Sequence, residues 1–388
     1  MGERAQFWLQ LTVFSLVAAS FTNVYITQPV LPVLQQEFGA DPATVSYTVA
    51  AVILGIALAN LPFGAAADHY PIRPIILIGG LTVASAGIIC AITDNLWILI
   101  GARFLQGLFI PAMTTCLAAY LARTLPVERL NVIMGAYISA TVLGGLGGRL
   151  LGGWIHPPLH WRYTFVSAAL LILVAAAVAL KTLPKDHAQP RETTTNGGFL
   201  KLIRRWELLR IYLTASGSFF IFSSVFNFLP FRLSAAPFNF STEIITLLYL
   251  TYVMGIFMGP TAGRLGNRFG NGPILLAGTL LLALALILVS LPSLIAVVAG
   301  LLTLCTGFFA VHAAAVGALN RKVSSGQGRA NALYVLFYYL GGWIGISVCG
   351  LMLEQFQWPG VIFTCALLLL VPLMAGVSEL RHKTQAPG

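Results

Sequence analysis

Twelve apolar segments occupy most of this 388-residue chain, and they constrain its fold more than any other feature. Each is long enough to cross the hydrocarbon core of a bilayer as a helix, which takes about 20 residues. The chain is 58% hydrophobic and 9% charged, whereas soluble domains carry about 25% charged residues, so a soluble fold is excluded. The predicted spans are residues 7–34, 46–67, 74–93, 96–121, 130–154, 162–181, 209–231, 244–265, 273–291, 294–319, 331–353 and 360–378.

The basic residues are confined to alternate connections between these spans. Most of the 22 Lys and Arg fall at the two termini or in the connections that follow even-numbered spans. The exceptions are Arg103, Arg149, Arg162 and Arg232. By the positive-inside rule, both termini are predicted to be cytoplasmic. The same distribution accounts for the net charge of +10, so no nucleic-acid partner is expected.

The longest polar stretch, residues 182–208, divides the spans into six and six. We therefore expect an N-terminal six-helix bundle over 1–181, a cytoplasmic linker, and a C-terminal bundle over 209–388. Within the linker, residues 189–198 predict a flexible segment. Residues 199–210 combine apolar and basic positions in a pattern typical of a helix lying on anionic membrane lipids. A basic linker with no role beyond topology is the alternative.

The two halves repeat weakly, with equivalent residues about 200 positions apart. The aligned pairs are Gly64 with Gly263, Asp68 with Asn267, Gln106 with Thr306, Gly144 with Gly341, and Trp161 with Trp358. Such parallel six-span repeats are a transporter architecture, in which the substrate site lies near the membrane midplane between the halves.

The connection after span 2 carries a short motif with Gly64, Asp68 and Arg73. It resembles the loop signature G-x-x-x-D-R-x-G-R-R of the major facilitator superfamily, although His69 and Pro71 depart from it. The resemblance implies that Asp68 is a gating residue. A carboxylate there can pair with a helix N-terminus or a nearby Arg, and a simple helix cap is the alternative.

The second copy of this loop retains Gly263 and Arg268 and has Asn267 in place of the acid. In span 4, Arg103 and Gln106 belong to a sequence that resembles the R-x-x-Q-G signature of the same superfamily. The resemblance implies that this Arg acts in proton transfer or in substrate binding.

Span 5 contains glycines whose spacing resembles the antiporter signature G-x8-G-x3-G-P-x2-G-G. The glycines in register are Gly135, Gly144, Gly148, Gly152 and Gly153, and Arg149 replaces the proline. Glycine permits close approach of membrane helices, so this face is interpreted either as a sliding surface between the halves or as static packing. Residues 28–32 and 329–342 are similar to a YnfM-type subgroup of drug:proton efflux carriers.

The resemblance covers nearly the whole chain and implies an all-α membrane protein of twelve helices in two six-helix bundles. It further implies a monomeric, multi-pass transporter of the bacterial inner membrane with a small-molecule substrate, protons as a coupling partner and lipids around it. No cofactor or metal is expected, since the five cysteines are scattered through apolar spans. No P-loop, H-E-x-x-H or G-x-S-x-G motif occurs, so the chain is not predicted to be an enzyme.

Arg149 and Arg103 are cations within predicted spans. A charge at this depth costs about 2.5–3.5 kcal/mol or more and usually faces a cavity or a partner. For Arg149 the alternative is that its side chain extends to the membrane surface. For Arg103 the alternative is hydrogen bonding to carbonyls where Pro29 breaks span 1.

All twelve Asp and Glu lie in connections or at span ends, which is unusual for a proton-coupled carrier. His312 is the one histidine within a predicted span, and it either carries the coupling proton or is a packing residue. Glu37 and Asp41, after span 1, are either outer proton acceptors or solvated charges. With two buried cations and no buried acid, an anionic or weakly acidic substrate is more plausible than a cationic drug.

Polar side chains on spans 1 and 7 and aromatic side chains of the C-terminal half are candidates to line a central cavity. The candidate residues of the transport cavity are Asn23, Gln28, Arg103, Gln106, Arg149, Asn227, Tyr252, His312, Tyr338 and Trp343. If the aromatic residues face the cavity, the substrate has an apolar or aromatic body. We therefore predict an exporter of small amphipathic organic molecules that works by alternating access. A proton-independent facilitator or an organic-anion exchanger is the alternative.

Overall fold

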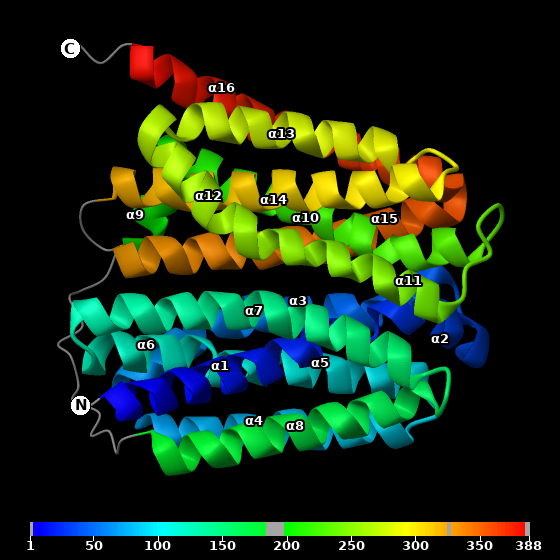
Figure 1. Ribbon diagram of the computed structural model, residues 1–388, viewed down its shortest axis with the longest axis horizontal. Helices are drawn as coiled ribbons and strands as arrows, with labels where there is room; N and C mark the ends of the chain where they lie inside the picture. The colour runs from blue at the N-terminus through cyan, green and yellow to red at the C-terminus, as the bar shows by residue number, and fades with distance from the viewer. Residues whose placement is uncertain (1–2, 184–197, 324–326, 385–388) are drawn as a thin grey trace. The chain divides into compact units, whose positions relative to one another are not determined.

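The structure is a computed structural model that describes residues 3–183, 198–323 and 327–384 (Figure 1). Every regular element in these residues is a helix, so the all-α prediction is confirmed. Ten segments of the described residues are long and apolar enough to cross a membrane. The orientation of the termini stays a prediction.

The first half of the chain forms eight α-helices and one short 3-10 helix. They are α1 (Glu3–Tyr25), η1 (Gln28–Val30), α2 (Leu31–Phe38), α3 (Pro42–His69), α4 (Ile72–Ile92), α5 (Leu96–Met113), α6 (Thr115–Thr124), α7 (Val127–Ile155) and α8 (Trp161–Thr182).

The described part of the second half also forms eight α-helices and one 3-10 helix. They are α9 (Gly198–Arg204), α10 (Trp206–Ser234), α11 (Thr242–Leu248), η2 (Tyr249–Val253), α12 (Met254–Phe269), α13 (Asn271–Leu288), α14 (Leu294–Lys322), α15 (Gln327–Leu368) and α16 (Leu370–Thr384).

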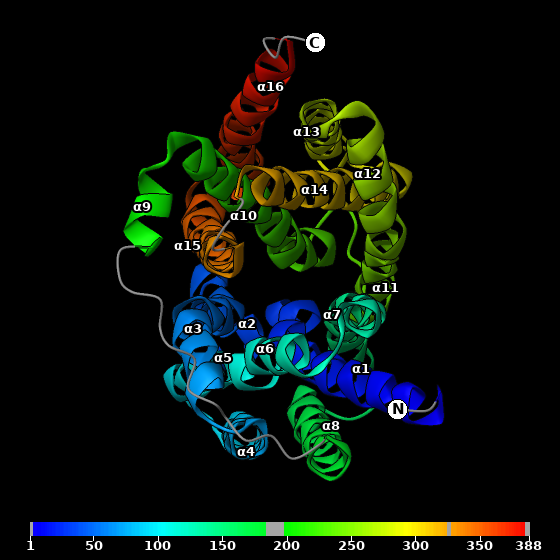
Figure 2. The same cartoon turned by 90° about the vertical axis from the view of Figure 1, so that its left-hand side faces the viewer.

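Contacts between Cα atoms divide the chain into two compact units. Unit 1 comprises Met1–Ala40, Tyr47–Thr193 and Ser241–Tyr249, and unit 2 comprises Asp41–Ser46, Thr194–Phe240 and Leu250–Gly388. Helix α11 thus belongs to unit 1, and the first turn of α3 belongs to unit 2. In unit 1, α1 packs on α7 and α4 packs on both α5 and α8. In unit 2, α10 packs on α15 and α13 on α14 (Figure 2).

The first predicted span is not one helix. Helix α1 ends at Tyr25, η1 begins with Pro29 in its first turn, and α2 has Pro32 in its first turn. Proline lacks an amide hydrogen and clashes with the preceding turn, so it favours the start of a helix over its interior. The break leaves carbonyl groups at the end of α1 without helical partners, and this places backbone acceptors inside unit 1.

Predicted spans 11 and 12 lie within α15 and α16, which are separated only by Leu369. The apolar stretch Gln327–Leu380 over these two helices is 54 residues long. This is more than twice the length that one crossing requires. Its backbone leaves the helical conformation at Gln357, with φ 55° and ψ −157°, two residues before Pro359. The two predicted spans therefore meet at this break.

The predicted linker is only partly described. Of the segment expected to be flexible, residues 189–197 lie outside the described residues. The amphipathic stretch 199–210 is not a single helix, because α9 ends at Arg204 and α10 begins at Trp206. Arg205 between them has an extended ψ of 105°. The domain boundaries predicted from the sequence stay predictions.

Candidate functional site

Arg103 lies on α5 and is completely buried in unit 1. Its guanidinium donates to the carbonyl oxygens of Asn23 and Val24 at 2.7 Å and of Thr48 at 2.9 Å, and to the side-chain oxygen of Gln106 at 2.6 Å. Arginine has five N–H donors, so most of them are occupied. The carbonyls of Asn23 and Val24 lie at the end of α1, next to the proline break. Arg103 therefore has the carbonyl-binding arrangement that the sequence offered as an alternative.

Gln106 and Asn23, both predicted to line the transport cavity, donate hydrogen bonds to backbone carbonyls. The Gln106 side chain also donates to the Val83 carbonyl at 3.1 Å, and the Asn23 side chain donates to the Ala19 carbonyl at 2.9 Å. Both side chains are fully buried. Together with Arg103 they form a polar cluster that joins α1, α4 and α5.

Arg149 lies on α7, is 1% exposed, and contacts a different part of the first span. Its Nε donates to the Gln28 side-chain oxygen at 2.8 Å, and its Nη1 donates to the Gly145 carbonyl at 2.9 Å. Its guanidinium carbon lies 4.0 Å from the centre of the Tyr25 ring and 5.5 Å from that of Tyr249. These identified partners are all uncharged, and the side chain does not extend to the surface.

The span-5 glycines lie mainly against α1. A methyl group on any of three of them would overlap a carbonyl oxygen of α1 or of the residue that follows it. The pairs are Gly144 with Ala18, Gly148 with Thr22, and Gly152 with Ile26. Because α1 and α7 are in the same unit, these three contacts are packing within one bundle. They fit the static-packing alternative, and the sliding surface stays a prediction.

The two remaining glycines of the signature differ from these. Gly153 faces the Thr246 side chain of α11, and a methyl group there would overlap it. Gly135 has no atom within 4 Å of the place where a methyl group would sit. Gly135 is therefore not an interface glycine, because the end of α7 on which it lies does not pack closely there.

Several predicted cavity residues of unit 2 come together in an aromatic cluster. The Nδ1 atom of His312 lies within hydrogen-bond distance of the Tyr334 hydroxyl, at 3.0 Å, and the His312 ring lies 5.3 Å from that of Tyr338. Phe222 stacks on Phe308 with ring centres 4.0 Å apart. The Tyr252 ring lies 5.8 Å from Phe222. Helices α10, α14 and α15 and η2 supply this cluster.

Asn227 on α10 is fully buried, and neither atom of its amide has a hydrogen-bond partner among the described residues. A buried amide without partners costs about 1–3 kcal/mol, which marks a place where a polar group of a ligand would be favourable. Trp343 on α15 is half-buried.

The predicted gating residues of the first half lie at one end of unit 1. The Asp68 carboxylate is 3.7 Å from the Arg123 guanidinium, which also donates to the Ala67 carbonyl. Arg73 donates to the Leu183 carbonyl. Gly64 has only the Thr115 side chain within 4 Å of a methyl position.

The second half has an analogous arrangement around Arg321. This residue donates to the Gly266 carbonyl at 3.1 Å and to the side-chain oxygens of Asn271 at 3.0 Å and Asn267 at 3.4 Å. Of the other two predicted residues, Arg268 lies over the Phe269 ring at 5.1 Å, and Gly263 has no atom within 4 Å of a methyl position.

Sequence reasoning missed Arg123 and Arg321, which contact the two loops that carry the predicted gating residues. A signal was present, since each is a basic residue in the last turn before a predicted connection, and the two are again about 200 positions apart. The same offset relates the loops that they contact.

Glu37 is not a solvated charge. Its carboxylate accepts from the Trp161 indole and from Arg162 at 3.1 Å, and it lies 3.7 Å from His160. Arg162 also pairs with Asp94 at 2.8 Å.

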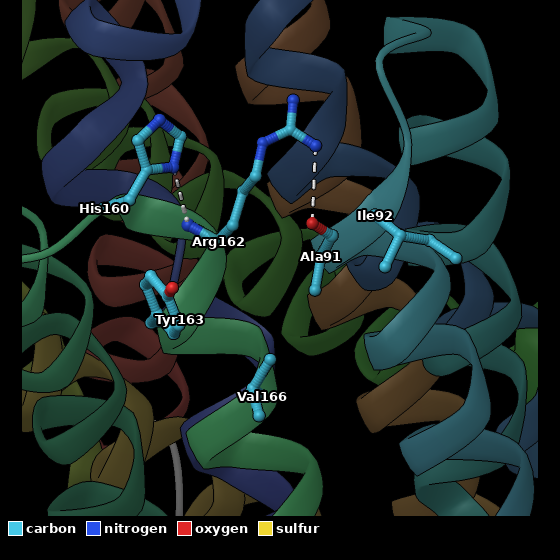
Figure 3. A pocket seen from close by; sticks show the side chains of 6 residues that line it. All are labelled: Ala91, Ile92, His160, Arg162, Tyr163 and Val166. Carbon is cyan, nitrogen blue, oxygen red and sulfur yellow. Dashed lines mark hydrogen bonds between the residues drawn. The ribbon is translucent and has the colours of Figure 1, made fainter.

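Beside this cluster, the ends of α4 and α8 enclose a surface pocket of about 480 Å³ (Figure 3). Figure 3 shows Arg162 directed at the Ala91 carbonyl, which it contacts at 3.3 Å. Because this guanidinium is already held by two carboxylates, we do not assign the pocket to the site.

Two titratable groups near the predicted outer ends of the helices have shifted pKa values. Burial lowers the pKa of His156, and the neighbouring His160 lowers it further, against opposing effects of Glu243 and Glu37. Burial alone would raise the pKa of Asp41, but hydrogen bonds from Glu354 and Thr44 outweigh it and lower the pKa overall.

Metal-binding residues do not cluster within the described ranges, where no group of three His, Cys, Asp or Glu side chains is suitably placed. The five cysteines are buried and reduced.

Comparisons with known proteins match nearly the whole chain. A family model described as Major Facilitator Superfamily matches residues 13–258 and 235–386. The inner membrane transport protein YnfM of Escherichia coli strain K12 is 29% identical over 372 residues, which cover 94% of this chain and 89% of that protein. A chloramphenicol resistance protein of Pseudomonas aeruginosa is 28% identical over 387 residues, with 96% and 90% covered.

A solved structure supports the same fold. The crystal structure of a bacterial homologue of the human lysosomal transporter Spinster, in an inward-facing and unoccupied conformation, aligns with a TM-score of 0.79. The alignment covers 98% of this chain and 99% of that chain at 16% identity. At this identity the similarity shows the fold alone.

Proposed function

Because this chain belongs to the major facilitator superfamily, we propose that it exports small amphipathic organic molecules by alternating access, coupled to the movement of protons. The chain is a multi-pass inner membrane transporter, as are its relatives, and not an enzyme. Its substrate is a small molecule. We propose the chemical class of this substrate, the direction of its transport and the coupling ion.

The observation that carries the proposal is the aromatic cluster of unit 2 together with the buried, unsatisfied amide of Asn227, which lies on α10, as does Phe222 of the cluster. Small-molecule sites in proteins are mostly apolar and aromatic, with a few polar groups that fix orientation. Such a lining suits a molecule with an apolar body and one or two polar groups. The similarity to a chloramphenicol resistance protein supports export as the direction.

His312 is the proposed proton carrier. Histidine is the side chain whose charge changes near neutral pH, and His312 is within hydrogen-bond distance of Tyr334 and stacked near Phe308. Loss of a proton to one side and uptake from the other would bias the carrier between its two conformations.

A second candidate function is a facilitator or organic-anion exchanger without a proton step. Two observations favour it: Arg103 and Arg149 are both buried, and all twelve Asp and Glu lie in connections or at the ends of predicted spans. An anionic substrate would need no titrating acid within a span.

The test measures export and proton movement together. The protein would first be expressed in an efflux-deficient bacterium, and growth would be measured across a panel of amphipathic compounds. A compound against which it protects would then be added to inverted vesicles that contain a pH-sensitive dye. Wild type should move protons with the compound, His312→Asn should not, and the exposed control His69→Asn should behave as wild type. Compound flux without a pH change would favour the exchanger, and no protection would refute export.

A further inference from the structure

The guanidinium of Arg232 and the indole of Trp358 form a stacked pair in unit 2. Arg232 lies in the last turn of α10, and Trp358 directly follows the break in α15. The guanidinium carbon lies 4.9 Å from the centre of the indole ring. The Nε of Arg232 and the Nε1 of Trp358 are both buried, and neither has a hydrogen-bond partner in the part of the chain that the structure describes. Buried N–H groups without acceptors are destabilising, so the pair offers two donors to another molecule.

Unit 1 contains the same kind of pair with an acceptor in place. The Arg162 guanidinium carbon lies 4.7 Å from the centre of the Trp161 ring. The Glu37 carboxylate joins the two, since one oxygen accepts from the indole and the other accepts from Arg162 at 3.1 Å. Trp161 and Trp358 are about 200 positions apart and are equivalent in the internal repeat. Unit 1 therefore shows that a stacked guanidinium and indole can bind one group with two anionic oxygens.

Unit 2 supplies no acid to its own pair. The connection after α10, residues 235–241, contains no Asp or Glu. The acid nearest to Trp358 in the chain is Glu354, and its carboxyl group is hydrogen-bonded to Asp41. Within the described ranges, no ion pair involves Arg232. An anionic group for this pair would have to come from outside the chain.

We infer that Arg232 and Trp358 bind the phosphate group of a membrane phospholipid. One phosphate oxygen would accept from Arg232 Nε and another from the indole N–H, as the two oxygens of Glu37 are shared in unit 1. Hydrogen bonds between a guanidinium and a phosphate are charge-assisted and stronger than neutral ones. This site shares no residue with the aromatic cluster and the Asn227 amide, and it does not depend on the export proposal.

The position of the pair favours a lipid over a dissolved anion. Predicted spans 7 and 9 end at residues 231 and 291, and predicted span 12 begins at 360, so the pair lies where the hydrocarbon core meets the headgroups. Arg232 Nη2 donates to the Leu291 carbonyl at 3.1 Å. The side chains of Leu291 and Phe356 are 44% and 60% exposed. Exposed apolar side chains beside a cation suit acyl chains below a phosphate, and tryptophan is enriched at this depth.

The experiment measures the affinity of purified, delipidated full-length protein for two pairs of probes by thermal-shift titration. Dioctanoyl phosphatidylglycerol is compared with dioctanoylglycerol, which lacks the phosphate, and octanoate is compared with octanamide. We expect wild type to bind the phospholipid at least about tenfold more tightly than dioctanoylglycerol. Trp358→Phe keeps an aromatic ring but has no N–H, and it should lower the affinity for the phospholipid about tenfold. Arg232→Gln should do the same. Trp206→Phe, at a position on α10 that is 62% exposed, should bind as wild type.

A second measurement separates lost binding from a damaged fold. Trp161→Phe and Trp358→Phe remove the same volume from largely buried positions. Only Trp161 donates to an acceptor of the chain, the Glu37 carboxylate. Without lipid, Trp161→Phe should therefore lower the melting temperature more than Trp358→Phe does.

The inference is overturned if wild type binds dioctanoylglycerol as tightly as the phospholipid, or if Trp358→Phe keeps the affinity of wild type. Octanoate binding that depends on Trp358, without a preference for the phospholipid, would assign the site to dissolved acids and would also overturn it. If Trp358→Phe unfolds as readily as Trp161→Phe, the indole N–H has a partner in the fold and the site is removed. Absence of protection in the export test would leave phospholipid binding untouched.

Discussion

Among single residues, Arg103 shows how one buried cation can hold a broken helix together. It donates to the carbonyls of Asn23 and Val24, which the proline break leaves without helical partners. Arg103→Met should lower the free energy of unfolding by at least about 3 kcal/mol, since several buried acceptors lose a charged donor. Thermal unfolding in detergent would measure the loss, and Arg103→Lys should recover part of it. A Met variant as stable as wild type would contradict this role.

His156 predicts a pH effect on stability. Its pKa is lowered in the folded protein, chiefly by burial, so the folded state binds this proton less readily than the unfolded state. Stability is then lost as pH falls below about 6.5, the ordinary histidine pKa. His156→Asn should weaken the fall in melting temperature between pH 8 and pH 5.5. His69→Asn, at an exposed position, should leave it unchanged, and equal falls in all three proteins would refute the assignment.

At the scale of helices, the contact between α1 and α7 depends on single glycines. A methyl group on Gly148 would overlap the Thr22 carbonyl, whereas one on the adjacent Gly147 would meet the Thr22 hydroxyl at 3.7 Å, an ordinary contact. Gly148→Ala should cost about 1–3 kcal/mol, as overpacking usually does, and Gly147→Ala should be close to neutral. Thermal unfolding of the two variants decides this, and equal melting temperatures would show that α1 can shift away.

The helices themselves were largely predictable, because the lengths of apolar segments and the positions of prolines are read from the local sequence. The contact partners of the site residues were harder to predict. Arg149 and Gln28 are 121 residues apart in the chain, and nothing in either segment specifies the other. The partner of the glycine face of α7 could not be predicted for a related reason, since glycines occur on several faces of that helix and only packing distinguishes them.

At the scale of the whole molecule, the two halves use the same contact. In unit 2, a methyl group on Gly341 of α15 would overlap the Ser216 carbonyl of α10, just as Gly144 of α7 meets Ala18 of α1. A hydroxyl also crosses each pair, from Thr22 to the Gly144 carbonyl at 3.3 Å and from Ser223 to Gly342 at 3.2 Å. Equivalent contacts at equivalent places support the duplication inferred from the sequence.

The orientation of the chain in the membrane is a prediction of the charge distribution, and cysteine labelling can test it. All five native cysteines are buried, so a new surface cysteine should dominate the reaction with a membrane-impermeant maleimide. Tyr70, between α3 and α4, is 62% exposed, and Leu159, between α7 and α8, is 65% exposed. An odd number of predicted crossings separates them, so they lie on opposite sides of the membrane. If basic connections are cytoplasmic, Leu159→Cys is labelled in intact cells and Tyr70→Cys only after lysis. The reverse pattern would place both termini outside and would refute the predicted orientation.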